Sequence, residues 1–154
     1  MKIAIIGTGN LGLSIAKGLV INNTYTALYL TKRDLETLDP WKEYDQVYVT
    51  QDNKKAVAAS DILIFAVQPS QMEGILNEIK SHLNDKHILI STITGFSIAR
   101  IEAIVGASTP IIRSMPNTAI SVAKSMTCLC SNALGKKRIA IAEAIFNGLG
   151  TSII

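Results

Sequence analysis

The chain has few aromatic residues and no long block of charge of one sign. Aromatic residues make up 5% of its 154 residues, and its basic residues are scattered apart from two short groups, at 31–33 and 136–138. Because nucleic-acid binders usually carry a longer basic stripe interleaved with aromatic residues, we expect no nucleic-acid partner. The formal net charge of +3 instead indicates a solvated surface with a local anion site.

A long apolar run is also lacking. The apolar residues that open the chain stop at Gly7, which is too early for the hydrophobic region of a secretory signal peptide. No later stretch approaches the ~18 apolar residues that cross a membrane. We therefore expect neither export nor contact with a membrane, and a cytoplasmic location.

Cysteine is scarce, with only Cys128 and Cys130. They lie two residues apart in an expected strand, so they share a face and cannot easily bridge each other. A C-x-C pair without further cysteines or paired histidines is a poor zinc pattern, so we expect no metal site. The sequence predicts two buried free thiols, which suits a reducing compartment.

What the sequence does contain is a regular alternation of short β-branched runs with segments of helical period. Its length and its 48% hydrophobic content fit one compact domain, residues 1–154. The alternation predicts an α/β fold with a mainly parallel sheet and helices on its faces. We expect strands at 2–6, 25–31, 46–50, 61–67, 87–93, 110–115, 125–130 and 150–154, and helices at 10–21, 52–60, from Pro69, 97–105 and 136–147.

Three glycines, Gly7, Gly9 and Gly12, follow the first strand in the order G-x-G-x-x-G. Such a match is weak alone, but here it stands between a buried strand and a helix. Gly7 permits a tight turn, Gly9 lets a pyrophosphate approach the backbone, and Gly12 lets the helix pack closely on the sheet. The spacing predicts a Rossmann-type doubly wound fold that holds a dinucleotide at the positive end of the first helix.

The end of the second strand indicates which dinucleotide binds. NAD-preferring sites place an acidic residue there, to bind the ribose 2′-hydroxyl. This chain has Thr31, Lys32 and Arg33 instead, and a hydroxyl with two cations suits a 2′-phosphate. The nearest acid, Asp34, is expected to start the next turn, although it would serve NAD if the strand ended later. NADP(H) is favoured, NAD(H) is possible, and the two cations could be ordinary surface residues.

A family is indicated by three later stretches taken together, 61–71, 90–102 and 111–127. The last contains Arg113, Met115, Pro116, Asn117 and Thr118, and it closely resembles the R-x-M-P-N-T signature of pyrroline-5-carboxylate reductase. The resemblance covers essentially the whole chain. It implies an NAD(P)H-binding domain that a helical domain follows in the complete protein, where that second domain forms a homo-oligomer and completes the substrate pocket. We expect the helical domain to be absent from these residues.

The resemblance also implies which residues bind the cofactor and how this chain departs from the family. Gln68 replaces the lysine of the usual A-V-K-P turn, and Ala119 stands where the family has proline. These changes bear on activity rather than on the fold. The implied cofactor-binding residues are Gly7, Gly9, Asn10, Leu11, Gly12, Thr31, Lys32, Arg33, Asn53, Ala66, Val67, Gln68, Pro69, Thr94, Gly95 and Asn117.

The implied reaction is hydride transfer from NADPH to the C=N bond of 1-pyrroline-5-carboxylate, which yields L-proline. No catalytic residue is assigned, since His82 and His87 are expected on the surface at the sheet edge opposite to the ligand. Two alternatives stay open. One is another NADP-dependent oxidoreductase, similar to F420-dependent NADP reductases or β-hydroxyacid dehydrogenases, and the other is a non-catalytic NADP(H)-binding module.

Overall fold

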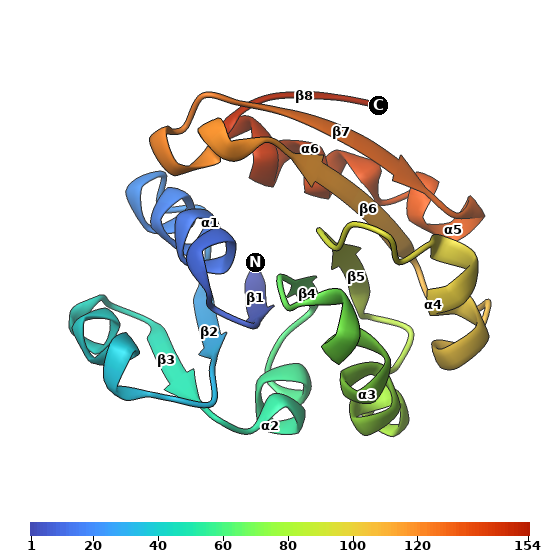
Figure 1. Cartoon of the computed structure of the whole chain (residues 1–154), viewed down its shortest axis with the longest axis horizontal. Helices are drawn as coiled ribbons and strands as arrows, with labels where there is room; N and C mark the ends of the chain where they lie inside the picture. Colours follow the sequence, from blue (N-terminus) through green and yellow to red (C-terminus); the bar gives the residue numbers. More distant parts are fainter.

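The computed structural model describes all residues, 1–154, and is built on one eight-stranded sheet with the order β3-β2-β1-β4-β5-β6-β7-β8 (Figure 1). Only the β6–β7 pair is antiparallel, and every other neighbouring pair is parallel. This confirms the mainly parallel sheet. The strands are β1 (Lys2–Ile6), β2 (Ala27–Thr31), β3 (Val47–Thr50), β4 (Ile62–Phe65), β5 (Ile88–Ser91), β6 (Ile111–Pro116), β7 (Ser125–Ser131) and β8 (Gly150–Ile153).

Helices cover both faces of the sheet, as the alternation predicts. Two of them, α1 and α6, contribute to one hydrophobic core, and α2, α3 and α4 contribute to the other. No helix of the structure combines the length and the apolarity that crossing a membrane requires. The helices are α1 (Asn10–Ile21), α2 (Asn53–Ala58), α3 (Pro69–Ile79), α4 (Ile98–Val105), α5 (Ala133–Lys136) and α6 (Ile139–Asn147), with 3-10 turns η1 (Glu36–Glu43), η2 (Lys80–His82) and η3 (Thr118–Val122).

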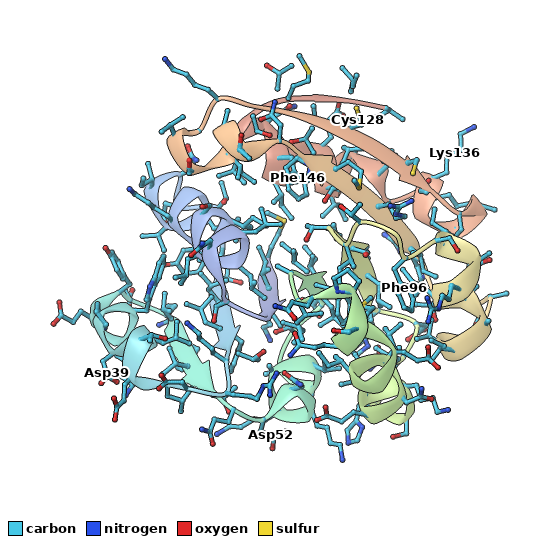
Figure 2. The ribbon with its side chains drawn as sticks, viewed as in Figure 1. Asp39, Asp52, Phe96, Cys128, Lys136 and Phe146 are labelled. Atoms are coloured by element: carbon cyan, nitrogen blue, oxygen red, sulfur yellow. The ribbon has the colours of Figure 1, made fainter.

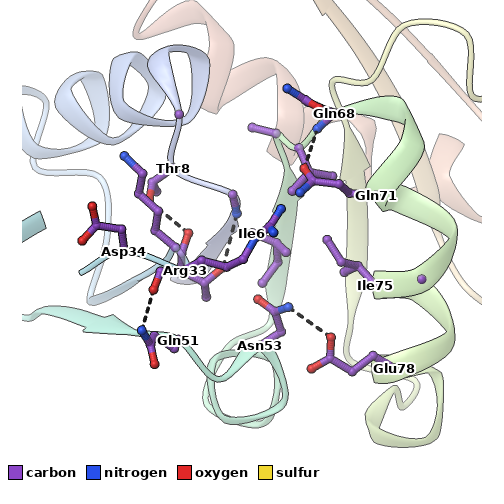
Figure 3. A pocket seen from close by; sticks show the side chains of 17 residues that line it. Ile6, Thr8, Arg33, Asp34, Gln51, Asn53, Gln68, Gln71, Ile75 and Glu78 are labelled. Carbon is purple, nitrogen blue, oxygen red and sulfur yellow. Dashed lines mark hydrogen bonds between the residues drawn. The ribbon is translucent and has the colours of Figure 1, made fainter. Parts of the chain in front are cut away.

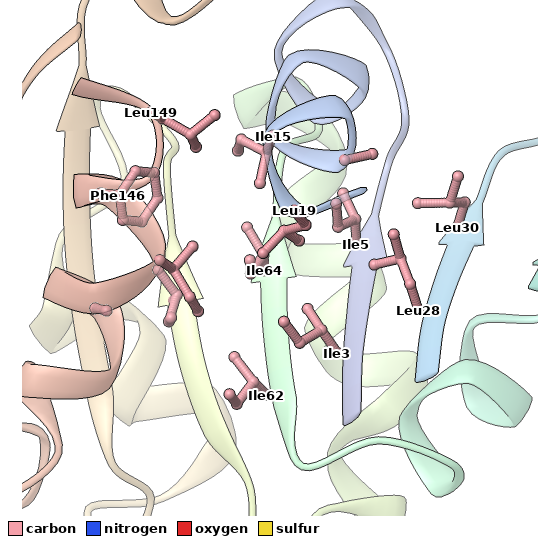
Figure 4. Close-up of a cluster of buried hydrophobic side chains, with 14 of the residues drawn as sticks. Ile3, Ile5, Ile15, Leu19, Leu28, Leu30, Ile62, Ile64, Phe146 and Leu149 are labelled. Atoms are coloured by element: carbon pink, nitrogen blue, oxygen red, sulfur yellow. The ribbon is translucent and has the colours of Figure 1, made fainter. Parts of the chain in front are cut away.

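The central strands are buried on both sides, because side chains of each strand belong to both hydrophobic cores. In β1, Ile3 and Ile5 belong to the core under α1 and α6, and Ala4 and Ile6 belong to the core under α2, α3 and α4. Figure 4 shows side chains of α1 and of the α6–β8 region meeting over β1, β2 and β4. A strand packed on both faces reads as a continuous apolar run, which is why the alternation of polar and apolar residues is missing there.

The expectation of buried thiols is wrong, because Cys128 and Cys130 are both exposed. Along β7 buried and exposed residues alternate, and Figure 2 shows Cys128 on the outer side of the sheet, away from Phe146 of α6. A helix therefore covers only one face of β7. The two cysteines do share a face and carry no disulfide.

Two further expectations need correction. His87 is buried, with only 2% of its surface exposed. Both ring nitrogens have partners there: the backbone N–H of Asn84 donates to Nδ1 at 3.0 Å, and Nε2 lies 3.1 Å from the carbonyl oxygen of Val57. His82 is exposed, as expected. The helix expected over 136–147 is α6, which begins only at Ile139; the short helix α5 before it was not expected, and the chain turns between the two at Lys137 and Arg138.

Candidate dinucleotide-binding site

The three glycines after β1 serve different purposes. Gly7 has a φ of +89°, and a Cβ there would lie 2.3 Å from Cγ1 of Val67. A Cβ on Gly12 would lie 2.4 Å from the carbonyl oxygen of Gly7, whereas a Cβ on Gly9 would meet no atom within 4 Å. Packing and conformation therefore require Gly7 and Gly12, while Gly9 leaves the turn open on its outer side.

The first turn of α1 offers free backbone donors. Its first internal hydrogen bond runs from Leu13 N to the Gly9 carbonyl oxygen, 2.9 Å away, and the backbone N–H groups of Gly9, Asn10 and Leu11 have no acceptor. No side chain caps this helix, and no acidic residue lies in its first turn. Unpaired N–H groups at a helix N-terminus favour a phosphate ligand.

A cleft of about 690 Å³ opens beside this turn at the carboxyl ends of β1, β2 and β4 (Figure 3). An adjoining hollow of about 350 Å³ shares Gly9, Ala66, Val67 and Gln68 with it and continues toward β5. The first is lined by Ile6, Gly7, Thr8, Gly9, Thr31, Lys32, Arg33, Asp34, Gln51, Asn53, Ala66, Val67, Gln68, Gln71, Gly74, Ile75 and Glu78. The second adds Asn10, Leu11, Pro69, Thr92, Ile93 and Thr94.

These two hollows bring together all of the cofactor residues expected from the sequence except Gly12, Gly95 and Asn117. Gly12 lies beneath the turn, against Gly7. Gly95, with a φ of +77°, follows Thr94 in the loop between β5 and α4. The side chain of Asn117 caps η3, where its Oδ1 accepts from Ala119 N at 3.1 Å.

Two cations, Lys32 and Arg33, lie at the end of β2 in a cleft that the acidic residues Asp34 and Glu78 also line. Neither Lys32 nor Arg33 has a carboxylate partner, because the ion pairs of the structure join Lys42 to Asp39 and Arg100 to Glu73. The carboxylate of Asp34 instead accepts the backbone N–H of Glu36 at 3.1 Å. Asp34 thus starts a turn, as the sequence predicts, and two cations remain free to meet a phosphate.

Several lining residues were missed by the sequence reasoning. On α3, Gln71, Gly74, Ile75 and Glu78 face the cleft, and the spacing of three, four and seven residues that places them on one helix face could have revealed them. The carboxylate of Glu78 accepts from Nδ2 of Asn53 at 3.3 Å. The side-chain amide of Gln51 donates to the carbonyl oxygen of Arg33.

The parallel sheet, the open glycine turn and the cleft at the strands' carboxyl ends define the class of protein, a Rossmann-type dinucleotide-binding domain. A family model described as "NADP oxidoreductase coenzyme F420-dependent" matches residues 2–95. The chain belongs to this family of oxidoreductases, and it corresponds to the N-terminal NAD(P)-binding domain of pyrroline-5-carboxylate reductases.

Comparison with individual proteins supports that correspondence. "Pyrroline-5-carboxylate reductase 1" of Dictyostelium discoideum is 39% identical over 99% of this chain, which spans 30% of that relative. The structure of a pyrroline-5-carboxylate reductase from Coxiella burnetii superposes with a TM-score of 0.92 at 33% identity, over 99% of this chain and 57% of that one. The structure of the Plasmodium falciparum pyrroline carboxylate reductase, solved with NADP bound, superposes with a TM-score of 0.85 at 26% identity, over 99% of this chain and 56% of that one. The chain therefore spans about half or less of these relatives.

Proposed function

We propose that this chain is the NADPH-binding domain of an enzyme that reduces 1-pyrroline-5-carboxylate to L-proline. The observation that carries the proposal is the pairing of free backbone N–H groups at Gly9, Asn10 and Leu11 with two unpaired cations, Lys32 and Arg33, along one cleft. A dinucleotide with an additional 2′-phosphate matches both features. NAD(H) lacks that phosphate and gains nothing from the two cations.

Each part of the cleft has a distinct task in this proposal. The amides of the first turn of α1 bind the diphosphate, Lys32 and Arg33 bind the 2′-phosphate, and Asn53 lies at the adenosine end. The nicotinamide then lies in the second hollow, along Ala66–Pro69 and Thr94, while Gly95 and Asn117 stay in the proposal only as contacts that the resemblance implies. The bound cofactor supplies a hydride, and this chain fixes the position of the ring against its substrate.

The substrate and the assembly belong to the proposal as well. The relatives' names specify pyrroline-5-carboxylate, and their greater length fits a second, helical domain that completes the substrate pocket and forms a homo-oligomer. We propose that the 154 residues bind the cofactor but form little proline on their own, and we assign the proton donor to no particular residue. A cytoplasmic location is part of the same proposal.

A second candidate deserves a test because the matching family model names coenzyme F420. A chimera tests whether this domain can serve a pyrroline-5-carboxylate reductase: residues 1–154 replace the N-terminal domain of the Coxiella burnetii reductase, and the same chimera with Gly9→Val is the control. NADPH-dependent reduction of 1-pyrroline-5-carboxylate by the chimera, lost in the control, is the expected result. A folded chimera that binds NADPH but reduces no 1-pyrroline-5-carboxylate would contradict the proposed function, and hydride exchange between NADPH and F420 by residues 1–154 themselves would favour the second candidate.

A further inference from the structure

Thr31 stands at the end of β2, beside the two cations, but its hydrogen bonds lead elsewhere. Its Oγ1 accepts the backbone N–H of Gly7 at 3.2 Å. Its carbonyl oxygen accepts both the backbone N–H and the hydroxyl of Thr8, each at 3.0 Å. Three donors from two consecutive residues of the glycine turn therefore converge on this one residue.

The surroundings of Thr31 hold it in that role. It pairs with Ile6 of β1 on one side and with Thr50 of β3 on the other, and only 2% of its surface is exposed. The next residues differ, since Lys32 is half-buried and Arg33 is exposed. The Thr31 hydroxyl is thus occupied as an acceptor and almost shielded from solvent at the edge of the cleft, whereas the two cations are open to the cleft.

The division of backbone donors follows from these contacts. Thr31 accepts hydrogen bonds from the N–H groups of Gly7 and Thr8, whereas the N–H groups of Gly9, Asn10 and Leu11 have no acceptor. Because the turn is tied to β2 at its first two amides, the next three amides, on residues that line the two hollows, are held in place as well. Fixed donors bind an anion better than donors that must be ordered on binding.

We propose that Thr31 is a positioning residue for the cofactor's diphosphate and does not serve as a ligand of the 2′-phosphate. The proposal rests on the proposed NADPH-binding function and revises one part of the sequence-based expectation, which grouped Thr31 with Lys32 and Arg33. It separates two tasks at the end of β2. Thr31 affects binding of the diphosphate, which NADPH and NADH share, and the cations bind the 2′-phosphate, which only NADPH carries.

The test measures the affinity of the 154-residue chain for NADPH, NADH and adenosine 2′-monophosphate, which lacks the diphosphate. Thr31→Val removes the hydroxyl with little change of shape. We expect about tenfold weaker binding of both dinucleotides, because the Gly7 N–H loses a buried acceptor. The NADPH-to-NADH ratio and the affinity for adenosine 2′-monophosphate should stay unchanged.

Three other variants complete the design. Thr31→Ser keeps the hydroxyl and should restore both dinucleotide affinities to within about twofold of those of the unmodified chain, a rescue that a general packing effect would not give. Arg33→Gln should weaken NADPH and adenosine 2′-monophosphate but spare NADH. Thr151→Val, on the exposed side of β8, is the matched control and should change nothing.

Thr8→Val keeps the test decisive if Thr31→Val does not fold, because it removes the hydroxyl that donates to the Thr31 carbonyl oxygen from the other side. It should weaken both dinucleotides in parallel. The proposal is overturned if Thr31→Val weakens NADPH and adenosine 2′-monophosphate but spares NADH, or if Thr31→Val and Thr8→Val both leave all three affinities unchanged. An unmodified chain that binds neither dinucleotide would instead overturn the proposed function itself.

Discussion

At the scale of single residues, the three glycines of the turn differ in what a side chain would meet. The sequence reasoning assigned a separate purpose to each glycine, and the contacts at Gly7 and Gly12 bear out the turn and the close packing. Nothing in the sequence, however, shows that the Thr31 hydroxyl accepts from Gly7 or that His87 reaches the carbonyl oxygen of Val57. Those partners lie 24 and 30 residues away and meet only through the sheet.

The open side of Gly9 leads to a first prediction. Gly9→Val should weaken NADPH binding at least about tenfold, because the side chain would occupy the space of the diphosphate. Valine can adopt the backbone conformation of Gly9, φ −76° and ψ −161°, so the free energy of unfolding should fall by only about 1 kcal/mol. Calorimetric titration and chemical denaturation measure the two effects.

Gly12→Val is the matched contrast. Its Cβ would overlap the Gly7 carbonyl oxygen, so the free energy of unfolding should fall by about 3 kcal/mol. Equal stability of the two variants, or undiminished NADPH affinity in Gly9→Val, would refute the role of this turn.

The two unpaired cations lead to a second prediction. Attraction between Lys32 or Arg33 and a 2′-phosphate is screened by salt, because both groups are partly or fully exposed. Raising sodium chloride from about 0.02 M to about 0.5 M should therefore lower the NADPH-to-NADH affinity ratio at least about threefold. In the double variant Lys32→Gln, Arg33→Gln the ratio should not respond to salt, and a response there would place the 2′-phosphate elsewhere.

At the scale of elements, the sequence predicts the sheet better than its surroundings. All eight strands occur where β-branched runs indicate them, Pro69 opens α3, and Ser97 caps α4 by accepting from Arg100 N at 3.2 Å. Local residue chemistry determines these features, so they can be read from the chain. The sequence did not indicate α5, because a helix of four residues is too short to show an apolar period.

A third prediction concerns Asn132, whose side chain joins α4, β6 and α5. Its Oδ1 accepts from Ile111 N at 3.1 Å and Gly135 N at 2.7 Å, and its Nδ2 donates to the carbonyl oxygen of Thr109 at 2.9 Å and to Glu102 at 2.8 Å. Asn132→Ala leaves these groups unpaired and should lower the free energy of unfolding by about 2–3 kcal/mol.

The control for Asn132 is Asn77→Ala, since the exposed side chain of Asn77 makes local contacts within α3 and with Lys80. It should change stability by less than about 0.5 kcal/mol. Denaturation curves that place Asn132→Ala within the same small range would show that the link between α4, β6 and α5 contributes little.

At the scale of the whole molecule, the helices that cover each face of the sheet determine which side chains are accessible to solvent. The sequence predicts that the two cysteines share a face, but the side of β7 that a helix covers depends on where α6 packs, which no local pattern reveals. Cys128 and Cys130 were therefore assigned to the wrong environment. The cleft itself could be predicted in outline, because the glycine turn and the strand ends locate it, while the wall formed by α3 shows in the sequence only as residues spaced three, four and seven apart on one helix face.

The exposure of the thiols gives a fourth prediction. A thiol-specific reagent added to the folded chain should modify both cysteines at rates close to that of a small free thiol, because neither is shielded. Cys128→Ser and Cys130→Ser should each retain one reactive group. Modification that requires denaturant would mean that the outer face of β7 is covered in solution.

The central claim is that the first turn of α1 binds a diphosphate while Lys32 and Arg33 bind a 2′-phosphate. A crystal structure of the chain with NADPH tests it most directly. The account predicts diphosphate oxygens within hydrogen-bond distance of the amides of Gly9, Asn10 or Leu11, and the 2′-phosphate in contact with Arg33. A dinucleotide bound elsewhere, or one whose 2′-phosphate points away from both cations, would contradict it.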